Sequence, residues 1–228
     1  MNKQILIIAA HPDDEVLGCG GTIARLTKEG HDVYAAILGE GITSRYDKRE
    51  QADRELMNKL HDRSQQVSKV IGVKELFLFD LPDNRFDTVP LLDIVKIIES
   101  LIERLQPQIV YTHHSGDLNI DHVITHRAVM TATRPTENCS VKEIYTFEVP
   151  SSTEWAFGQF RPAFQPNVFM DISATLETKI QAMQIYESEI RHFPHPRSSQ
   201  VLRAIAERWG SDVGLSAAEA FQLTRSIK

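Results

Sequence analysis

The sequence has few cysteines, no excess of basic residues and no long hydrophobic run. Only Cys19 and Cys139 occur among its 228 residues, too few for a disulfide framework, and we expect both to stay reduced thiols. The 25 Lys and Arg residues are outnumbered by 31 Asp and Glu residues, for a formal net charge of −6. The composition therefore lacks the basic excess that binding to nucleic-acid phosphates requires, and we expect no nucleic-acid partner.

Apolar residues are plentiful but scattered. They make up 42% of the chain, and the sequence contains no internal repeat and no low-complexity segment. We therefore expect a single domain over residues 1–228. The apolar stretch after Lys3 is too short for a secretory signal or for the roughly 20 residues of a membrane-spanning helix. We therefore expect no membrane span and a cytoplasmic location, and a homo-oligomer is compatible with these features.

The alternation of apolar runs and amphipathic stretches predicts a doubly wound α/β sheet. Strands are predicted at residues 5–9, 33–38, 76–79, 108–112 and 143–149. Helices are predicted at residues 14–29, 48–71, 91–105 and 173–186, after Asp121, and at 219–225, where a closing helix would pack back onto the domain. The pattern favours a Rossmann-like, three-layer α/β/α core with a mostly parallel sheet over residues 1–149. Residues 150–228 are less regular and rich in aromatic residues, and we expect them to form a C-terminal specificity segment.

The motif Ala-His-Pro-Asp-Asp-Glu at residues 10–15 lies where the first predicted strand becomes a helix. In a parallel α/β sheet, ligands bind at the carboxyl ends of strands, near the reversal of strand order. There His11 can offer an imidazole nitrogen and Asp14 a carboxylate oxygen, while Asp13 between them stays a free base. Acidic residues at a helix start can also serve only as caps and as partners of the helix dipole, so this motif alone leaves two interpretations open.

A second polar cluster follows the predicted strand at residues 108–112. Its members are His113, His114, Asp117, Asn119, Asp121 and His122. The residues after Asp121 return to helical spacing, so this segment is again a strand, a polar loop and a helix start. Two junctions of the same kind, each rich in potential ligands, favour a metal site over simple helix capping.

With these two motifs the chain resembles the LmbE/PIG-L family of zinc-dependent N-deacetylases. The family's first motif corresponds to residues 10–15, and its second motif ends in Asp-His, here Asp121-His122. The resemblance implies the following roles: zinc ligands at His11, Asp14 and His122, a general base at Asp13, and an orienting residue at Asp121. It also implies the fold and the order of elements through about residue 150.

The implied activity is hydrolysis of an N-acetyl group on an acetamido sugar or sugar conjugate. A ligand set of two histidines and one aspartate leaves open positions on zinc, which is typical of catalytic sites. Zinc lowers the pKa of a bound water from 15.7 towards roughly 7, and Asp13 would accept the proton as zinc-bound hydroxide attacks the acetamide. Fe²⁺ or another divalent ion could bind the same ligands.

One position departs from the family pattern. Many members carry a histidine three residues before the metal-binding histidine, and here that residue is Asn119. An asparagine amide can donate a hydrogen bond to an oxyanion but cannot supply a proton. The general acid is therefore open between Asp13 acting in both steps and one of four histidines, namely His113, His114, His192 and His195.

Four residues are predicted to contact the substrate, although each could instead be a solvated loop residue. Arg45 follows the second predicted strand, on the same edge as both motifs, and His114 lies in the second cluster. His195 and Arg197 belong to a proline-rich loop at residues 191–198, whose backbone proline restrains. The aromatic residues of the C-terminal segment suit stacking on a sugar face.

Three other functions can be weighed against deacetylation. A binding module could keep the pocket without turnover, and the sequence alone does not separate it from an enzyme. Non-haem iron oxygenases use a similar ligand set, but on His-x-Asp motifs in all-β scaffolds. The glycines at residues 18–21 lie too far after the first strand for a dinucleotide-binding loop, and we expect them to permit close helix packing.

Overall fold

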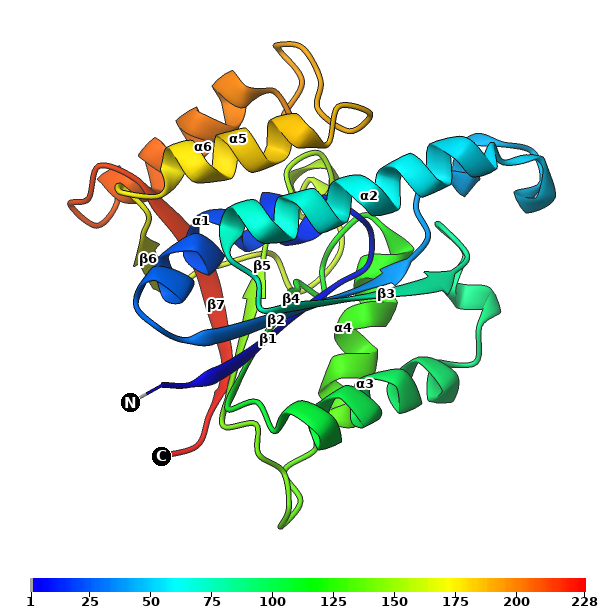
Figure 1. Cartoon of the computed structure of the whole chain (residues 1–228). Coiled ribbons are helices and arrows are strands. Elements are labelled where there is room, and N and C mark those ends of the chain that lie inside the picture. The colour runs from blue at the N-terminus through cyan, green and yellow to red at the C-terminus, as the bar shows by residue number, and fades with distance from the viewer. Residues whose placement is uncertain (1) are drawn as a thin grey trace.

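Seven strands form one sheet through the middle of the computed structural model, which describes residues 2–228 (Figure 1). The strands are β1 (Gln4–Ala9), β2 (Asp32–Gly39), β3 (Glu75–Leu81), β4 (Ile109–His113), β5 (Glu143–Phe147), β6 (Val168–Asp171) and β7 (Ala218–Ser226). They lie in the order β3-β2-β1-β4-β5-β7-β6. Neighbours from β3 to β5 are parallel, whereas β7 runs antiparallel to both β5 and β6.

Helices cover both faces of this sheet (Figure 1). They are α1 (Asp14–Lys28), α2 (Arg54–Ile71), α3 (Leu91–Leu105), α4 (Ile120–Ala132), α5 (Leu176–Ile185) and α6 (Ser199–Ser211). One buried hydrophobic cluster packs α1, α2, α5 and α6 on one face, and a second packs α3 and α4 on the other. The predicted α/β/α architecture with a mostly parallel sheet is confirmed. Across residues 2–228, no helix has both the length and the apolar character needed to cross a membrane.

The strand β1 lies at the centre of the sheet and is covered on both faces. Ile5 and Ile7 belong to the hydrophobic cluster on the α1 face, while Leu6 and Ile8 belong to the cluster on the α3 face. All four side chains are completely buried. A strand in this position has no solvent-facing side, which explains why its sequence is an unbroken apolar run rather than an alternating one.

The strand order reverses between β1 and β4, which are neighbours in the sheet although β2 and β3 lie between them in the chain. At such a point the loops leave the two strands in opposite directions and open a crevice at their carboxyl ends. The strand β1 ends just before His11, and β4 ends at His113. The fold therefore brings the two polar motifs to one edge, as the sequence predicted.

The helix α1 bends at Cys19, whose φ of −148° is not helical, and it packs closely against its neighbours. A Cβ atom on Gly18 would overlap the ring of Phe147, and a Cβ atom on Gly21 would lie 2.9 Å from the side chain of Ile172. The absence of side chains at these two positions therefore permits the close packing that was predicted for the glycines.

A buried ion pair from the C-terminal segment compensates for this bend. The amides of Gly21 and Thr22 donate hydrogen bonds of 3.0 and 2.7 Å to the carboxylate of Glu219. Lys179 Nζ donates to Leu17 O at 2.8 Å and lies 2.6 Å from Glu219 Oε1. In a regular helix the Gly21 amide would donate to Leu17 O. The ion pair thus satisfies both ends of an interrupted helical hydrogen bond.

The prediction of a helix at residues 219–225 is wrong, because these residues belong to β7. Without β7 the edge of β5 would leave backbone amides and carbonyls unpaired, and β7 pairs with it. Phe221 also packs edge-on against the ring of Tyr111, with centroids 5.0 Å apart. A segment of seven residues is too short for its apolar spacing to distinguish a helix from a strand. Pairing with β5 therefore decides that this segment is a strand.

Some element boundaries also differ from those predicted. The helix α2 begins at Arg54 rather than at residue 48, because the side chain of Asp53 caps it by accepting hydrogen bonds from two amides of its first turn. The helix α5 begins at Leu176 rather than at residue 173. The strand β6 and the helix α6 were not predicted, since both lie in the less regular C-terminal segment.

Candidate metal centre

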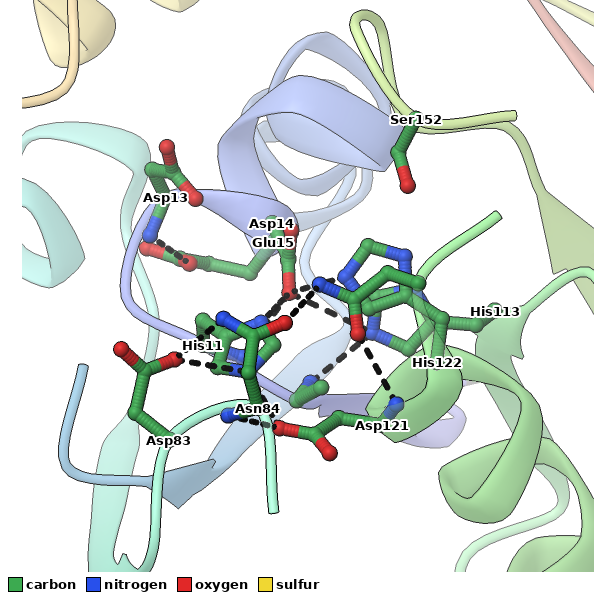
Figure 2. Close-up of polar contacts among 12 residues, drawn as sticks. His11, Asp13, Asp14, Glu15, Asp83, Asn84, His113, Asp121, His122 and Ser152 are labelled. Carbon is green, nitrogen blue, oxygen red and sulfur yellow. Dashed lines mark hydrogen bonds and ion pairs between the residues drawn. The ribbon is translucent and has the colours of Figure 1, made fainter. Parts of the chain in front are cut away.

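Three side chains from the two junctions meet beneath a pocket at the edge of the sheet (Figure 2). His11 Nδ1 and His122 Nε2 lie 3.3 and 3.2 Å from the same atom, Oδ2 of Asp14. One ligand atom from each residue lies within 4.8 Å of the others. Two imidazoles and one carboxylate form a donor set that suits Zn²⁺ or Fe²⁺. The residues present therefore fit a single divalent metal ion.

Each of the two imidazoles has a carboxylate beside its other nitrogen. His11 Nε2 lies 2.9 Å from Asp121 Oδ2, and His122 Nδ1 lies 3.1 Å from Asp117 Oδ1. Carboxylates in this position fix the tautomer and the ring orientation of metal-binding histidines. Asp121 therefore lies where an orienting residue for His11 would lie, and Asp117 has the corresponding place beside His122.

A second group of donors shares His11 with the first and consists of His11, Asp83 and Asp121. Asp121 is already occupied there, because its carboxylate accepts hydrogen bonds from the amides of Asn84 at 2.6 Å and Phe86 at 2.9 Å. These bonds anchor the turn after β3 to the start of α4. Asp14 accepts one main-chain hydrogen bond, at Oδ2 from the His11 amide at 2.8 Å, whereas Asp121 accepts one on each of its two oxygens. The His11, Asp14 and His122 group therefore keeps more donor capacity for a metal ion than the second group does.

Burial and charge act against each other on the pKa values of this centre. Burial alone would raise the pKa of Asp14, but His122, His113 and a hydrogen bond with His11 hold it well below its usual range. Burial alone would lower the pKa of His122, but Asp14 and Asp117 raise it to about 9. The carboxylate is thus ionised, and protons compete with a metal ion for the imidazole nitrogens as the pH falls.

Asp13 faces the same pocket but does not act as an ordinary helix cap. It is the residue before α1, and its side chain accepts no hydrogen bond from the helix amides. Instead its Oδ2 accepts a hydrogen bond of 2.8 Å from Arg197 Nη1. Burial raises the pKa of Asp13 well above its usual range, and the positive charge of Arg197 only partly offsets this. A buried carboxylate with a raised pKa suits a general base.

The pocket above these residues has a volume of about 290 Å³ and draws on both parts of the chain. Besides the metal-centre residues and Asp13, its lining includes Ser44, Arg45, Leu60, Asp83, Asn84, Asn119, Ser151, Trp155, Glu189, Arg191, His195 and Arg197. Of the four predicted substrate contacts, Arg45, His195 and Arg197 therefore line the pocket. His114 does not, since it is buried elsewhere with Nε2 2.7 Å from Pro162 O.

The lining residues are already engaged with one another. Arg45 Nη2 lies 2.7 Å from both carboxylate oxygens of Glu189. Asn119 caps α4 by accepting a hydrogen bond from the Asp121 amide at 2.8 Å, and its own amide group donates to Asn84 at 2.9 Å. The wall is thus a connected polar network, in which Asn119 still has one N–H to offer a ligand.

The four histidines considered as general acids have different surroundings. His113 is completely buried, and its Nε2 accepts a hydrogen bond of 2.8 Å from the Ala10 amide. His114 and His192 do not line the pocket, whereas His195 does. The Nδ1 of His195 accepts a hydrogen bond of 3.1 Å from the Arg197 amide, so in its neutral form the ring carries its proton on Nε2.

Several residues that line the pocket, and one that lies beside the metal centre, were not assigned a role from the sequence. Asp83 and Asn84 lie after β3, on the same edge as both motifs, and this place in the sheet is the signal that could have identified them. Asp117 was noted in the second cluster but was given no role. Ser151 and Glu189 come from the C-terminal segment, where no motif marks them. Only the packing of that segment against α1 and β4 brings them into the pocket.

The fold and the site together define a class of protein, an α/β domain with a candidate mononuclear metal centre at its topological switch point. A family model for GlcNAc-PI de-N-acetylases, PIG-L, matches residues 6–133. The chain belongs to this family, as the resemblance in its motifs indicated. The matched range includes both strand-to-helix junctions and every candidate metal ligand.

Proteins similar to this chain include sugar deacetylases and, at the level of the fold, an enzyme of another kind. Diacetylchitobiose deacetylase of Thermococcus kodakarensis is 29% identical over 99% of this chain and 84% of its own length. A solved structure of N,N'-diacetylchitobiose deacetylase from Pyrococcus horikoshii superimposes with a TM-score of 0.76, at 21% identity, over 98% of this chain and 84% of that one. The structure of GalB, a 4-carboxy-2-hydroxymuconate hydratase of Pseudomonas putida, superimposes with a TM-score of 0.77 at 20% identity. The superposition covers 99% of this chain and 98% of GalB. The fold by itself therefore does not determine the reaction.

Proposed function

We propose that this protein is a metal-dependent N-deacetylase that removes the acetyl group from an acetamido sugar or sugar conjugate. The observation that carries the proposal is the convergence of His11, Asp14 and His122 in one pocket with the carboxylate of Asp13, which belongs to neither group of candidate metal ligands. Membership in the PIG-L family and the similarity to a diacetylchitobiose deacetylase support the substrate class. Zinc is the proposed metal, with Fe²⁺ as the alternative for the same ligands.

The proposed roles follow from the contacts of each residue. His11, Asp14 and His122 would hold a divalent ion, which would supply Lewis acidity to a water molecule and to the amide carbonyl. Asp13 accepts the proton of the attacking water, while Asp121 and Asp117 keep the two imidazoles oriented. Removal of that proton allows the water oxygen to bond to the carbonyl carbon.

The departing amine needs a proton when its C–N bond breaks, and we assign this step to Asp13 as well. Asp13 has just accepted the proton of the water and lies on the pocket wall. Of the four candidate histidines, only His195 lines the pocket. Burial and the charges of Arg197 and Arg191 lower the pKa of His195, which favours its neutral form. His195 is therefore better suited to donate a hydrogen bond than to transfer a proton, and Asn119 can donate its free N–H to the oxyanion.

The pocket wall supplies the proposed sugar contacts. Arg45, His195 and Arg197 offer hydrogen-bond donors, although Arg45 and Arg197 already pair with carboxylates. Trp155 lines the pocket and is 40% exposed, so its ring is available to stack on a sugar face. These contacts would hold the sugar so that its acetamido group reaches the metal centre.

Acetate release from a panel of substrates tests the proposal directly. The panel contains free N-acetylglucosamine, diacetylchitobiose, nucleotide-linked and lipid-linked acetamido sugars. We expect at least one substrate to release acetate, the activity to disappear after chelation and zinc to restore it. A metal-loaded protein that releases acetate from none of these, yet still binds acetamido sugars, would instead be a binding module.

A further inference from the structure

Asp13 holds a backbone conformation that is unusual for a residue with a side chain. Its φ is 104°, in the left-handed region that favours glycine. A residue that precedes a helix is ordinarily extended, and an aspartate there binds the helix amides with its side chain. Strained conformations of this kind persist only when the surrounding structure enforces them. The contacts around Asp13 identify what enforces this one.

The main chain of Asp13 is held by Glu15. The Asp13 amide donates a hydrogen bond of 3.1 Å to Glu15 Oε2 (Figure 2), and the Tyr186 hydroxyl donates one of 2.7 Å to Glu15 Oε1. Glu15 is 3% exposed and Tyr186 is completely buried. Tyr186 directly follows α5, so a residue of the C-terminal segment controls the geometry at the start of α1.

A general preference for acidic residues at helix starts does not explain Glu15. That preference arises from the positive end of the helix dipole and requires no specific hydrogen-bond partner. Glu15 is instead buried, and each of its oxygens receives one specific hydrogen bond. Burying a carboxylate is costly unless it is hydrogen-bonded, so Glu15 is stable in this place only while both contacts are kept. Keeping them fixes the position of the Asp13 amide.

The side chain of Asp13 is held separately from its main chain. Arg197 Nη1 donates to Asp13 Oδ2 at 2.8 Å, and Arg197 Nε donates to Ser151 Oγ at 2.7 Å. If the main chain relaxed to the ordinary conformation of an N-cap, the carboxylate would be free to bind the helix amides instead. The carboxylate would then turn away from the pocket.

We propose that Glu15 and Tyr186 are positioning residues for the general base, which keep Asp13 in the left-handed conformation that directs its carboxylate into the pocket. The inference rests on the function proposed above for Asp13. Tyr186 and Glu15 do not line the pocket, so their removal should slow the proton transfer without weakening substrate binding. A small misplacement of a reacting group is enough to lower a rate strongly.

The variant Tyr186→Phe removes the hydroxyl and keeps the buried ring. We expect kcat for acetate release to fall about 10-fold, while KM and the metal content stay at the level of the unaltered protein. The matched control is Tyr145→Phe, whose lost hydroxyl donates to Glu143 on β5, and this variant should keep full activity. An unchanged kcat in Tyr186→Phe would overturn the inference.

A double variant separates positioning from a general structural effect. In an Asp13→Asn background the base is already absent, so adding Tyr186→Phe should cause no further loss of the residual activity. An equal fractional loss in both backgrounds would mean that Tyr186 acts only on overall structure, which would also overturn the inference.

Replacement of Glu15 gives a second test that does not depend on Tyr186→Phe folding. Glu15→Gln can still accept from the Asp13 amide and donate to the Tyr186 oxygen, so it should retain most of the activity, whereas Glu15→Met should match Tyr186→Phe. Equal activity in the two Glu15 variants would contradict this inference but leave the proposed function standing. Absence of acetate release from the metal-loaded unaltered protein would contradict the proposed function and remove the basis of this inference as well.

Discussion

Every candidate metal ligand comes from residues 2–149, whereas much of the pocket wall that faces them comes from residues 150–228. In the first region, parallel strands lead directly into helices, and the ligands occupy the junctions β1–α1 and β4–α4. In the second region, two antiparallel strands and two helices extend the sheet and cover α1 (Figure 1). The difference indicates that local chain geometry places the ligands, while long-range packing builds the space around them.

The second region also supports the first. Lys179 and Glu219 complete the hydrogen bonds of α1 at its bend. Arg197 donates a hydrogen bond to the Asp13 carboxylate, and Tyr186 donates one to Glu15, whose carboxylate also accepts from the Asp13 amide. The C-terminal segment is therefore more than the specificity element that its aromatic composition predicted. It also holds the proposed catalytic base and the helix that carries it.

The largest effect should come from removing a ligand of the first region. His122→Ala takes one of three donors from the metal centre, so we expect metal content and acetate release to fall to background. The counterpart in the second region is His195→Ala, which should retain its metal and most of its turnover. Metal content measured on both purified proteins checks this contrast, and similar metal loss in the two variants would contradict the division between the regions.

The proposed base should be separable from the metal. Asp13→Asn keeps the size of the side chain and can adopt a left-handed backbone, but it cannot accept the proton of the water. We expect full metal content and a kcat lowered by about 10²- to 10⁴-fold, the usual contribution of a general base. The check is steady-state kinetics on metal-loaded protein, and a variant with unchanged kcat would rule out this role for Asp13.

The support that the second region gives to α1 should appear as stability. Lys179→Met leaves the carboxylate of Glu219 buried without its partner, and loss of one member of a buried pair costs about 3–5 kcal/mol of unfolding free energy. Denaturant unfolding followed by circular dichroism measures this change. Arg203→Met, which breaks an exposed ion pair with Glu177, is the control and should leave the midpoint unchanged. Equal midpoints for the two variants would show that the buried pair gives α1 no special support.

The smallest effect should come from the rim of the pocket. Trp155→Ala removes the ring that we expect to stack on the sugar, at a cost of about 0.5–1.5 kcal/mol, so KM should rise several-fold while kcat stays the same. Phe157→Ala is the control, because Phe157 is 78% exposed and does not line the pocket. If both variants raise KM equally, Trp155 makes no specific contact with the sugar.

The sequence alone was sufficient for much of the first region. The strand β1, the helix α3 and the proximity of the two motifs were all predictable, because the periodicity of apolar residues and the rule for strand ends are local properties. The closing strand β7 was not predictable in this way. The apolar spacing of residues 219–225 is compatible with both a helix and a strand, and only the edge of β5 that needs a pairing partner decides for the strand.

What the sequence determined by itself was which potential ligands stand at the strand ends: His11 and Asp14 after the first strand, with Asp13 between them, and a polar cluster that includes His122 after the fourth. What only the tertiary structure decided was how that chemistry is held. Arg197 lies 184 residues from Asp13 along the chain, and Tyr186 lies 171 residues from Glu15. No local pattern encodes such pairs, because they form only when α5 and the loop after it pack against the start of α1.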